Sequence, residues 1–181
     1  MPHYLRLLLQ LVMSPARGWE DIADGAGSAR RALLHGLLPL AAIAAMTVYM
    51  GVFYQREATF GTLTVGAVVT FLKYSVSYFV AVAAMTYVLP RLTVDGLVNR
   101  EYAGLFSAYC LGIMAAIGII ENLLPMELTL LQFLPIYLVV VICKGRKFMD
   151  VDASNIFSFA ALGVFCTIVP VFFIDWLMQH I

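Results

Sequence analysis

The feature that most constrains this chain is a series of long stretches with almost no charged side chains. Five of them come close to or exceed the roughly 20 apolar residues that a helix needs to cross about 30 Å of hydrocarbon. They are residues 33–53, 63–89, 102–120, 126–143 and 156–177. Backbone polar groups must be paired inside lipid, so each stretch predicts a helix. We expect an all-α, polytopic membrane bundle with about five transmembrane helices.

Composition supports this fold class. Hydrophobic residues make up 62% of the chain and charged residues 12%, whereas soluble domains contain about 45–50% and about 25%. The formal net charge is zero, so no basic field indicates a nucleic-acid partner. Membrane lipids are the partner that the composition predicts.

Residues 1–32 precede the transmembrane domain, 33–181, and are predicted to form an amphipathic segment at the membrane interface. On a helix, His3, Arg6 and Gln10 share one face and leucines cover much of the rest, a pattern typical of helices that lie along the headgroup boundary.

A second short helix is predicted to begin within the same segment, after Ser14. Ser14 can cap a helix that starts at Pro15, and Trp19 suits an interface anchor. Pro15 and Trp19 are therefore the candidate contacts for a protein partner or lipid headgroups.

The distribution of Lys and Arg predicts the orientation in the membrane. Nine of the eleven lie in the N-terminal segment and in the second and fourth connections, one lies in the first connection, and Lys73 lies inside a span. Cytoplasmic loops carry the excess of Lys and Arg. We therefore expect a cytoplasmic N-terminus and a C-terminus on the outside.

The second span contains the strongest indication of a polar site. Thr70, Lys73 and Ser77 recur at helical spacing, and a lysine inside a membrane is costly enough to suggest function. Glu121 and Asp175, near the ends of the third and fifth spans, fall toward the same side. These five residues form a candidate outward-facing polar pocket. Snorkelling of Lys73 to the interface, or a purely structural ion pair, is the alternative.

The third span carries small residues at every fourth position: Gly104, Ala108, Gly112 and Ala116. Such a stripe lets another helix approach closely inside lipid. The partner helix can belong to the same chain or to a second copy in a homo-oligomer, and the sequence leaves both open.

Motifs for catalysis and cofactors are absent from the sequence. It contains no nucleophile elbow, phosphate loop, dinucleotide fingerprint or zinc-binding helix motif. The three histidines do not cluster with other ligands, as a metal site would require. We predict a protein that is not an enzyme and that has no cofactor or metal.

Two short motifs stand out in the chain: Ser14–Pro15 followed by Trp19 and Ile22, and Asp95–Gly96 followed by Arg100, Tyr102 and Tyr109 in a small-residue span. These motifs resemble the Yip family of multi-pass membrane proteins, named for Ypt/Rab-interacting proteins, in its bacterial branch. The resemblance implies five spans with a cytoplasmic N-terminus in a bacterial inner membrane. Eukaryotic members are implicated in vesicle traffic and Rab GTPase binding.

Two functions follow as hypotheses. The first is a non-enzymatic organiser of protein partners or lipids, with the N-terminal segment as its cytoplasmic contact surface. The second is a small transporter or channel-like protein that uses the pocket around Lys73.

Overall fold

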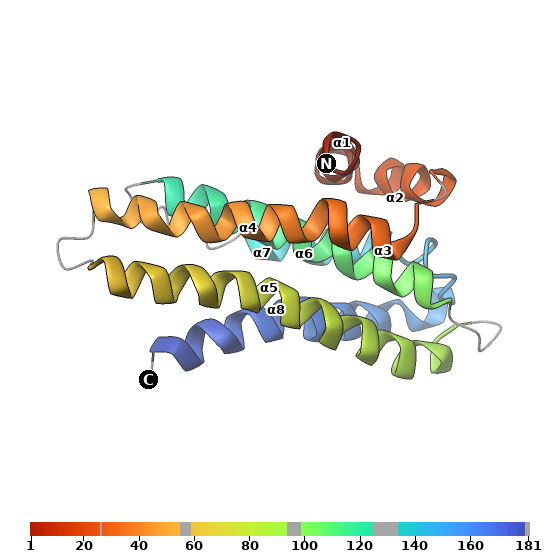
Figure 1. The fold of residues 1–181 in the computed structure, drawn as a ribbon. Helices are drawn as coiled ribbons and strands as arrows, with labels where there is room; N and C mark the ends of the chain where they lie inside the picture. The colour runs from red at the N-terminus through yellow and green to blue at the C-terminus, as the bar shows by residue number, and fades with distance from the viewer. Residues whose placement is uncertain (26, 55–58, 94–98, 125–133, 180–181) are drawn as a thin grey trace.

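The structure is a computed structural model that describes residues 1–25, 27–54, 59–93, 99–124 and 134–179 (Figure 1). Regular secondary structure in these residues is helical, and a single isolated bridge joins Thr93 to Val151. The prediction of an all-α polytopic helical bundle is confirmed.

The helices follow one another in chain order. They are α1 (Pro2–Met13), α2 (Pro15–Asp24), α3 (Ala29–Ala32), the π-helical turn η1 (Leu33–Leu37), α4 (Leu38–Thr47), the 3-10 turn η2 (Val48–Phe53), α5 (Phe60–Val88), the 3-10 turn η3 (Leu89–Arg91), α6 (Arg100–Leu123), α7 (Leu134–Lys144), the 3-10 turn η5 (Ala153–Asn155) and α8 (Ile156–Gln179).

Four helical segments are long and apolar enough to cross a membrane, so the chain is an integral membrane protein. They are Ala29–Phe53, Phe60–Arg91, Arg100–Leu123 and Ala153–Leu177, and they overlap the predicted first, second, third and fifth spans. Of the predicted fourth span, residues 126–133 lie outside the described residues, and the rest falls within α7, which has 11 residues.

Side chains at the helix starts explain several of these bounds. The Thr59 hydroxyl accepts the backbone N–H of Thr62, and the Thr59 N–H donates to the Thr62 hydroxyl, which together cap α5. At the start of α6 the Asn99 side chain accepts the N–H of Glu101. Each contact satisfies a donor that the first helical turn leaves unpaired.

Helix α6 is the central helix of the bundle. In its most apolar window 78% is buried within the protein, against 28% to 39% in the other three candidate spans. A Cβ at Gly104 would lie 2.5 Å from the Cβ of Ala29, and one at Gly112 would collide with the Tyr4 hydroxyl. The small-residue stripe of α6 therefore brings α3 and α1 of the same chain close, while Ala116 is half-buried.

Helices α1 and α2, here called the α1–α2 arm, lie across one side of the bundle near α3 (Figure 1). The arm buries Tyr4, Leu7, Leu8 and Leu11 and leaves Met13 exposed. The Tyr4 hydroxyl donates to the carbonyl of Ala108 at 2.8 Å. Burial raises the pKa of Tyr4 well above its usual range, so the hydroxyl stays protonated as the donor.

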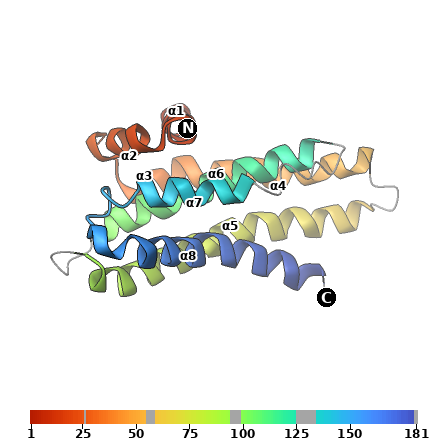
Figure 2. The same cartoon turned by 180° about the vertical axis from the view of Figure 1, so that it is seen from behind.

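Segments rich in Lys and Arg meet at one end of the bundle. Figures 1 and 2 show α3, the C-terminal end of α5, the start of α6 and the connection between α7 and α8 at that end. These segments carry Arg30, Arg31, Arg91, Arg100 and the run Lys144–Lys147. We call this the basic end. The end of α6 and the C-terminal part of α8 lie at the opposite end.

Candidate functional site

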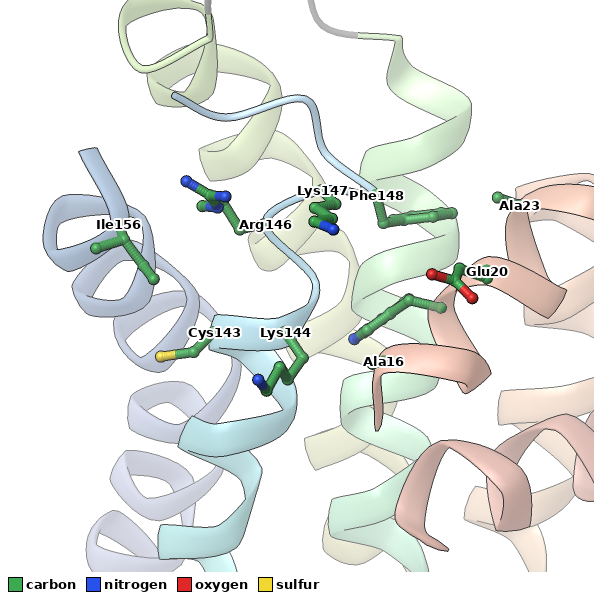
Figure 3. Close-up of a pocket in the computed structure, with 10 residues that line it drawn as sticks. Ala16, Glu20, Ala23, Cys143, Lys144, Arg146, Lys147, Phe148 and Ile156 are labelled. Atoms are coloured by element: carbon green, nitrogen blue, oxygen red, sulfur yellow. The ribbon is translucent and has the colours of Figure 1, made fainter. Parts of the chain in front are cut away.

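A cavity of about 500 Å³ opens at the basic end, between α2 and the segment in which α7 ends. This volume lies within the roughly 300–1,000 Å³ of typical ligand pockets. We call it the basic pocket. Its lining consists of Ala16, Trp19, Glu20, Ala23, Cys143, Lys144, Arg146, Lys147, Phe148 and Ile156 (Figure 3).

Trp19 holds the two walls of the basic pocket together. Its ring stacks on Phe106 and on Phe148, with centroids 5.0 Å apart in each pair, and its Nε1 donates to the carbonyl of Val141 at 2.9 Å. Gly145 makes the close approach possible, because a Cβ there would lie 2.6 Å from the ring of Phe106. The walls of the basic pocket are therefore fixed by packing between segments more than 120 residues apart.

Charges in the basic pocket are separated rather than paired. Lys144, Arg146 and Lys147 come from the end of α7 and the following turn, and Glu20 comes from α2. Within the described part of the chain, the one ion pair is formed elsewhere, by Lys73 and Asp175. The basic pocket thus presents three cations and one carboxylate that are not tied to each other, beside an apolar floor.

Pro15 and Trp19, the two predicted contact residues of the α1–α2 arm, differ in how deeply they are buried. Trp19 is 2% exposed, so its ring acts mainly inside the protein. Pro15 is half-buried at the start of α2 and does not line the basic pocket. Glu20 and the Lys144–Lys147 run were not predicted from the sequence as site residues. A signal was present, because the cations directly follow an apolar run and so fall at a membrane boundary.

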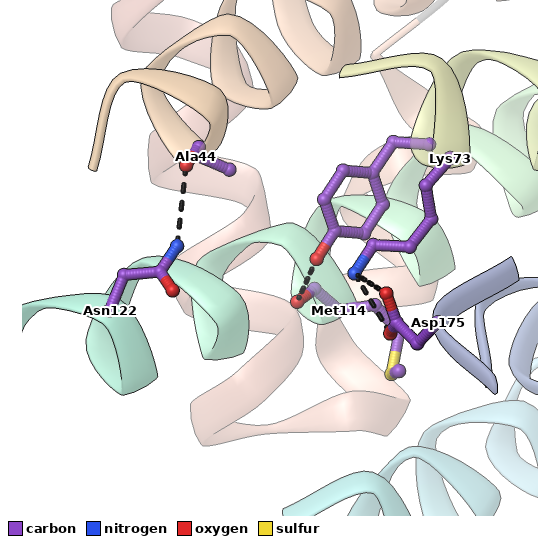
Figure 4. A network of polar contacts seen from close by, with 6 residues as sticks. Ala44, Lys73, Met114, Asn122 and Asp175 are labelled. Carbon is purple, nitrogen blue, oxygen red and sulfur yellow. Dashed lines mark hydrogen bonds and ion pairs between the residues drawn. The ribbon is translucent and has the colours of Figure 1, made fainter. Parts of the chain in front are cut away.

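A second, smaller cavity of about 110 Å³ lies at the opposite end, and we call its polar residues the polar cluster. It brings together four of the five residues predicted for the polar pocket: Thr70, Lys73, Glu121 and Asp175. The Lys73 amine lies 2.8 and 2.9 Å from the two carboxylate oxygens of Asp175 (Figure 4).

Ser77 is the predicted pocket residue that does not line this cavity. It is fully buried, and its hydroxyl has no hydrogen-bond partner among the described residues, a state it shares with Ser107. Glu121 lies on the cavity wall, exposed, and forms no ion pair within the described ranges. Lys73 is thus neutralised by Asp175, while the carboxylate of Glu121 remains available.

Two polar residues that the sequence analysis did not select tie the polar cluster to neighbouring helices. The Asn122 amide donates to the Ala44 carbonyl at 3.4 Å and to the Thr47 hydroxyl at 3.1 Å. The Tyr74 hydroxyl donates to the carbonyl of Met114 at 3.2 Å (Figure 4). These bonds link α4, α5 and α6, so the polar cluster also has a structural role.

Among the described residues, no three His, Cys, Asp or Glu side chains converge in a way that could hold a metal ion. No protein-family model, curated protein or solved structure matches this chain. The basic pocket and the polar cluster are the two candidate sites that we consider in this integral membrane protein.

Proposed function

We propose that this chain is a non-enzymatic membrane protein of the Yip-like type that binds phosphate-bearing lipids in the basic pocket and thereby organises its membrane surroundings. One observation carries the proposal. Three cations that are not paired within the described protein line a cavity of about 500 Å³ together with aromatic and aliphatic side chains. The Yip-like assignment itself rests on the sequence motifs around Trp19 and Arg100.

The chemistry of the lining favours a lipid headgroup as the occupant. Each Lys or Arg near an anionic membrane surface contributes about 1 kcal/mol of attraction, and basic pockets between membrane helices are suited to phosphate headgroups. Phe148 and Ile156 supply apolar surface beside the cations. A lipid can satisfy both features at once, because its phosphate adjoins its apolar portion.

Lipid retention by the purified protein tests this function. Native mass spectrometry would compare phosphatidylglycerol retained by the unmodified chain and by a variant with Lys144→Ala, Arg146→Ala and Lys147→Ala. We expect retention to fall in the variant, because the phosphate loses its three cations. A matched control with Arg30→Ala, Arg91→Ala and Arg100→Ala removes the same charge at the same end, outside the basic pocket. Equal loss in both variants would contradict the proposal.

We further propose that the N-terminus is cytoplasmic and the C-terminus outside, in a bacterial inner membrane. The collection of Lys and Arg at one end supports this orientation. With Cys143→Ser as background, a membrane-impermeant maleimide should label Thr59→Cys in intact cells. Ser154→Cys, at the basic end, should react only after permeabilisation. The reverse pattern would overturn the orientation.

A small transporter or channel-like protein is the second candidate function. The convergence of Thr70, Lys73, Glu121 and Asp175 on one cavity favours it. Proteoliposomes with a proton or sodium gradient would test it with the full chain and with Lys73→Ala. The transporter hypothesis expects a flux that Lys73→Ala abolishes. Absence of flux, or flux that the variant leaves unchanged, would remove this candidate.

A further inference from the structure

We infer that the basic pocket selects a phospholipid whose headgroup carries a primary ammonium as well as a phosphate, with Glu20 as the residue that recognises the ammonium. This inference rests on the proposed function, since it names the class of lipid that the basic pocket binds. The phosphate lies toward Lys144 and Arg146, and the ammonium lies toward Glu20.

The placement of Glu20 carries the inference. Figure 3 shows Glu20 on α2, apart from Lys144 and Arg146, which come from the other wall. No ion pair joins Glu20 to any of the three cations, although all four side chains line one cavity. A site for a purely anionic group would be weakened by this carboxylate. A headgroup with both a phosphate and an ammonium instead meets an opposite charge for each: the cations for the phosphate and Glu20 for the ammonium.

Hydrogen-bonding capacity narrows the headgroup further. The Trp19 indole N–H already donates to Val141, and its ring is 2% exposed and stacked on Phe106 and Phe148, so Trp19 offers the headgroup no free donor. The Glu20 carboxylate is an acceptor, and an –NH₃⁺ group has three donors with which to meet it. A quaternary ammonium has the same charge and no N–H. Phosphatidylethanolamine is therefore expected to bind more tightly than phosphatidylcholine.

A lipid suits the cavity better than a free phosphate ester. Ala16, Ala23, Phe148 and Ile156 give it an apolar lining that a small hydrophilic ester would leave unused. Ile156 also begins α8, part of a membrane-spanning segment, so the cavity borders the apolar layer. Soluble phosphoethanolamine carries the same two charges without the acyl chains and is the matched probe for this distinction.

The experiment measures which lipids the purified full-length chain retains from an equal mixture of phosphatidylethanolamine, phosphatidylcholine and phosphatidylglycerol, by native mass spectrometry. Phosphatidylethanolamine should be preferred over phosphatidylcholine by about tenfold, the effect of one charge-assisted hydrogen bond. Glu20→Gln should bring that ratio close to one while phosphatidylglycerol retention stays the same or rises. Asp24→Asn, on the same helix but outside the cavity, is the charge-matched control.

The outcomes separate this inference from the proposed function. If the triple variant of Lys144, Arg146 and Lys147 retains all three lipids normally, the proposed function fails and the headgroup assignment fails with it. If that variant loses lipid but the unmodified chain shows no preference, or Glu20→Gln keeps the preference, only the headgroup assignment is overturned. Displacement of the lipid by equimolar phosphoethanolamine would overturn the lipid as the occupant. Circular dichroism on heating checks that each variant is folded.

Discussion

At the opposite end of the bundle, Lys73 is 12% exposed and both oxygens of Asp175 lie within 2.9 Å of its amine. At the basic end, Lys144, Arg146 and Lys147 share a cavity with Glu20 and form no ion pair with it. A cation with little access to water needs a partner of opposite charge, because an unpaired charge is strongly destabilising there. Lys144 and Lys147 are exposed, so water stabilises their charges without an ion-pair partner. The ion pair at the opposite end therefore has mainly a structural role, whereas binding is what we propose for the basic end.

The largest effect is expected from Trp19→Ala, which would show whether the basic pocket is held by packing. Removing a large aromatic from a packed interior costs about 3–5 kcal/mol of unfolding free energy. Trp19→Phe keeps a ring against Phe106 but loses the hydrogen bond to Val141, which should lower the free energy of unfolding by about 1 kcal/mol. Chemical unfolding in detergent, followed by circular dichroism, measures both variants. Similar costs for the two would mean that the ring stacking contributes little.

A smaller loss is expected from Asp175→Ala, which tests the structural role of the pair at the opposite end. The variant leaves the Lys73 amine without its ion-pair partner. Because Asp175 is 40% exposed, the cost should be about 1–3 kcal/mol, below the range for fully buried pairs. The double variant Lys73→Met with Asp175→Leu should recover most of the loss in the same unfolding assay. If the double variant recovers no stability, the loss in Asp175→Ala has a cause other than the unpaired charge.

A third test asks whether the arm and the bundle are one unit. Gly112→Ala would push Tyr4 away and break its bond to Ala108, at a cost of about 1–3 kcal/mol. Trypsin should then cleave at Arg17 faster, and lipid retention should fall because α2 forms a wall of the basic pocket. Gly61→Ala is the control, since the nearest atom to its Cβ is 3.8 Å away. Equal cleavage rates in the two variants would contradict this coupling.

The smallest change in stability, within about 0.5 kcal/mol, is expected from Lys144→Ala. This exposed side chain forms no ion pair among the described residues. Lipid retention should nevertheless fall, whereas Asp175→Ala should lower stability and leave lipid retention unchanged. Each variant is therefore expected to lower the quantity that the other leaves nearly unchanged: Lys144→Ala lowers lipid retention, and Asp175→Ala lowers stability. A Lys144→Ala variant that lost stability as Asp175→Ala does would erase the distinction between the two ends.

Helix formation and the membrane class of this protein were determined by the sequence alone. Long apolar runs must pair their backbone groups internally in lipid, so residues such as 102–120 predict a helix without knowledge of any neighbour. The proximity of Lys73 to Asp175 could also be predicted from the sequence, because both residues lie toward the same side of the membrane in a five-span arrangement. Residues 126–133, part of the predicted fourth span, lie outside the described residues.

Only the tertiary structure decided which helix faces meet. The stripe at Gly104 and Gly112 indicated a close approach, but its partners, Ala29 and Tyr4, depend on how the arm and α3 pack onto α6. Trp19 fitted an interface anchor by its position in the chain, and the fold placed it between Phe106 and Phe148. The basic pocket exists because α2 docks beside a turn that is distant in sequence. Hydrophobicity and backbone hydrogen bonding act locally and can be read along the chain, whereas side-chain packing is a property of the assembled surfaces.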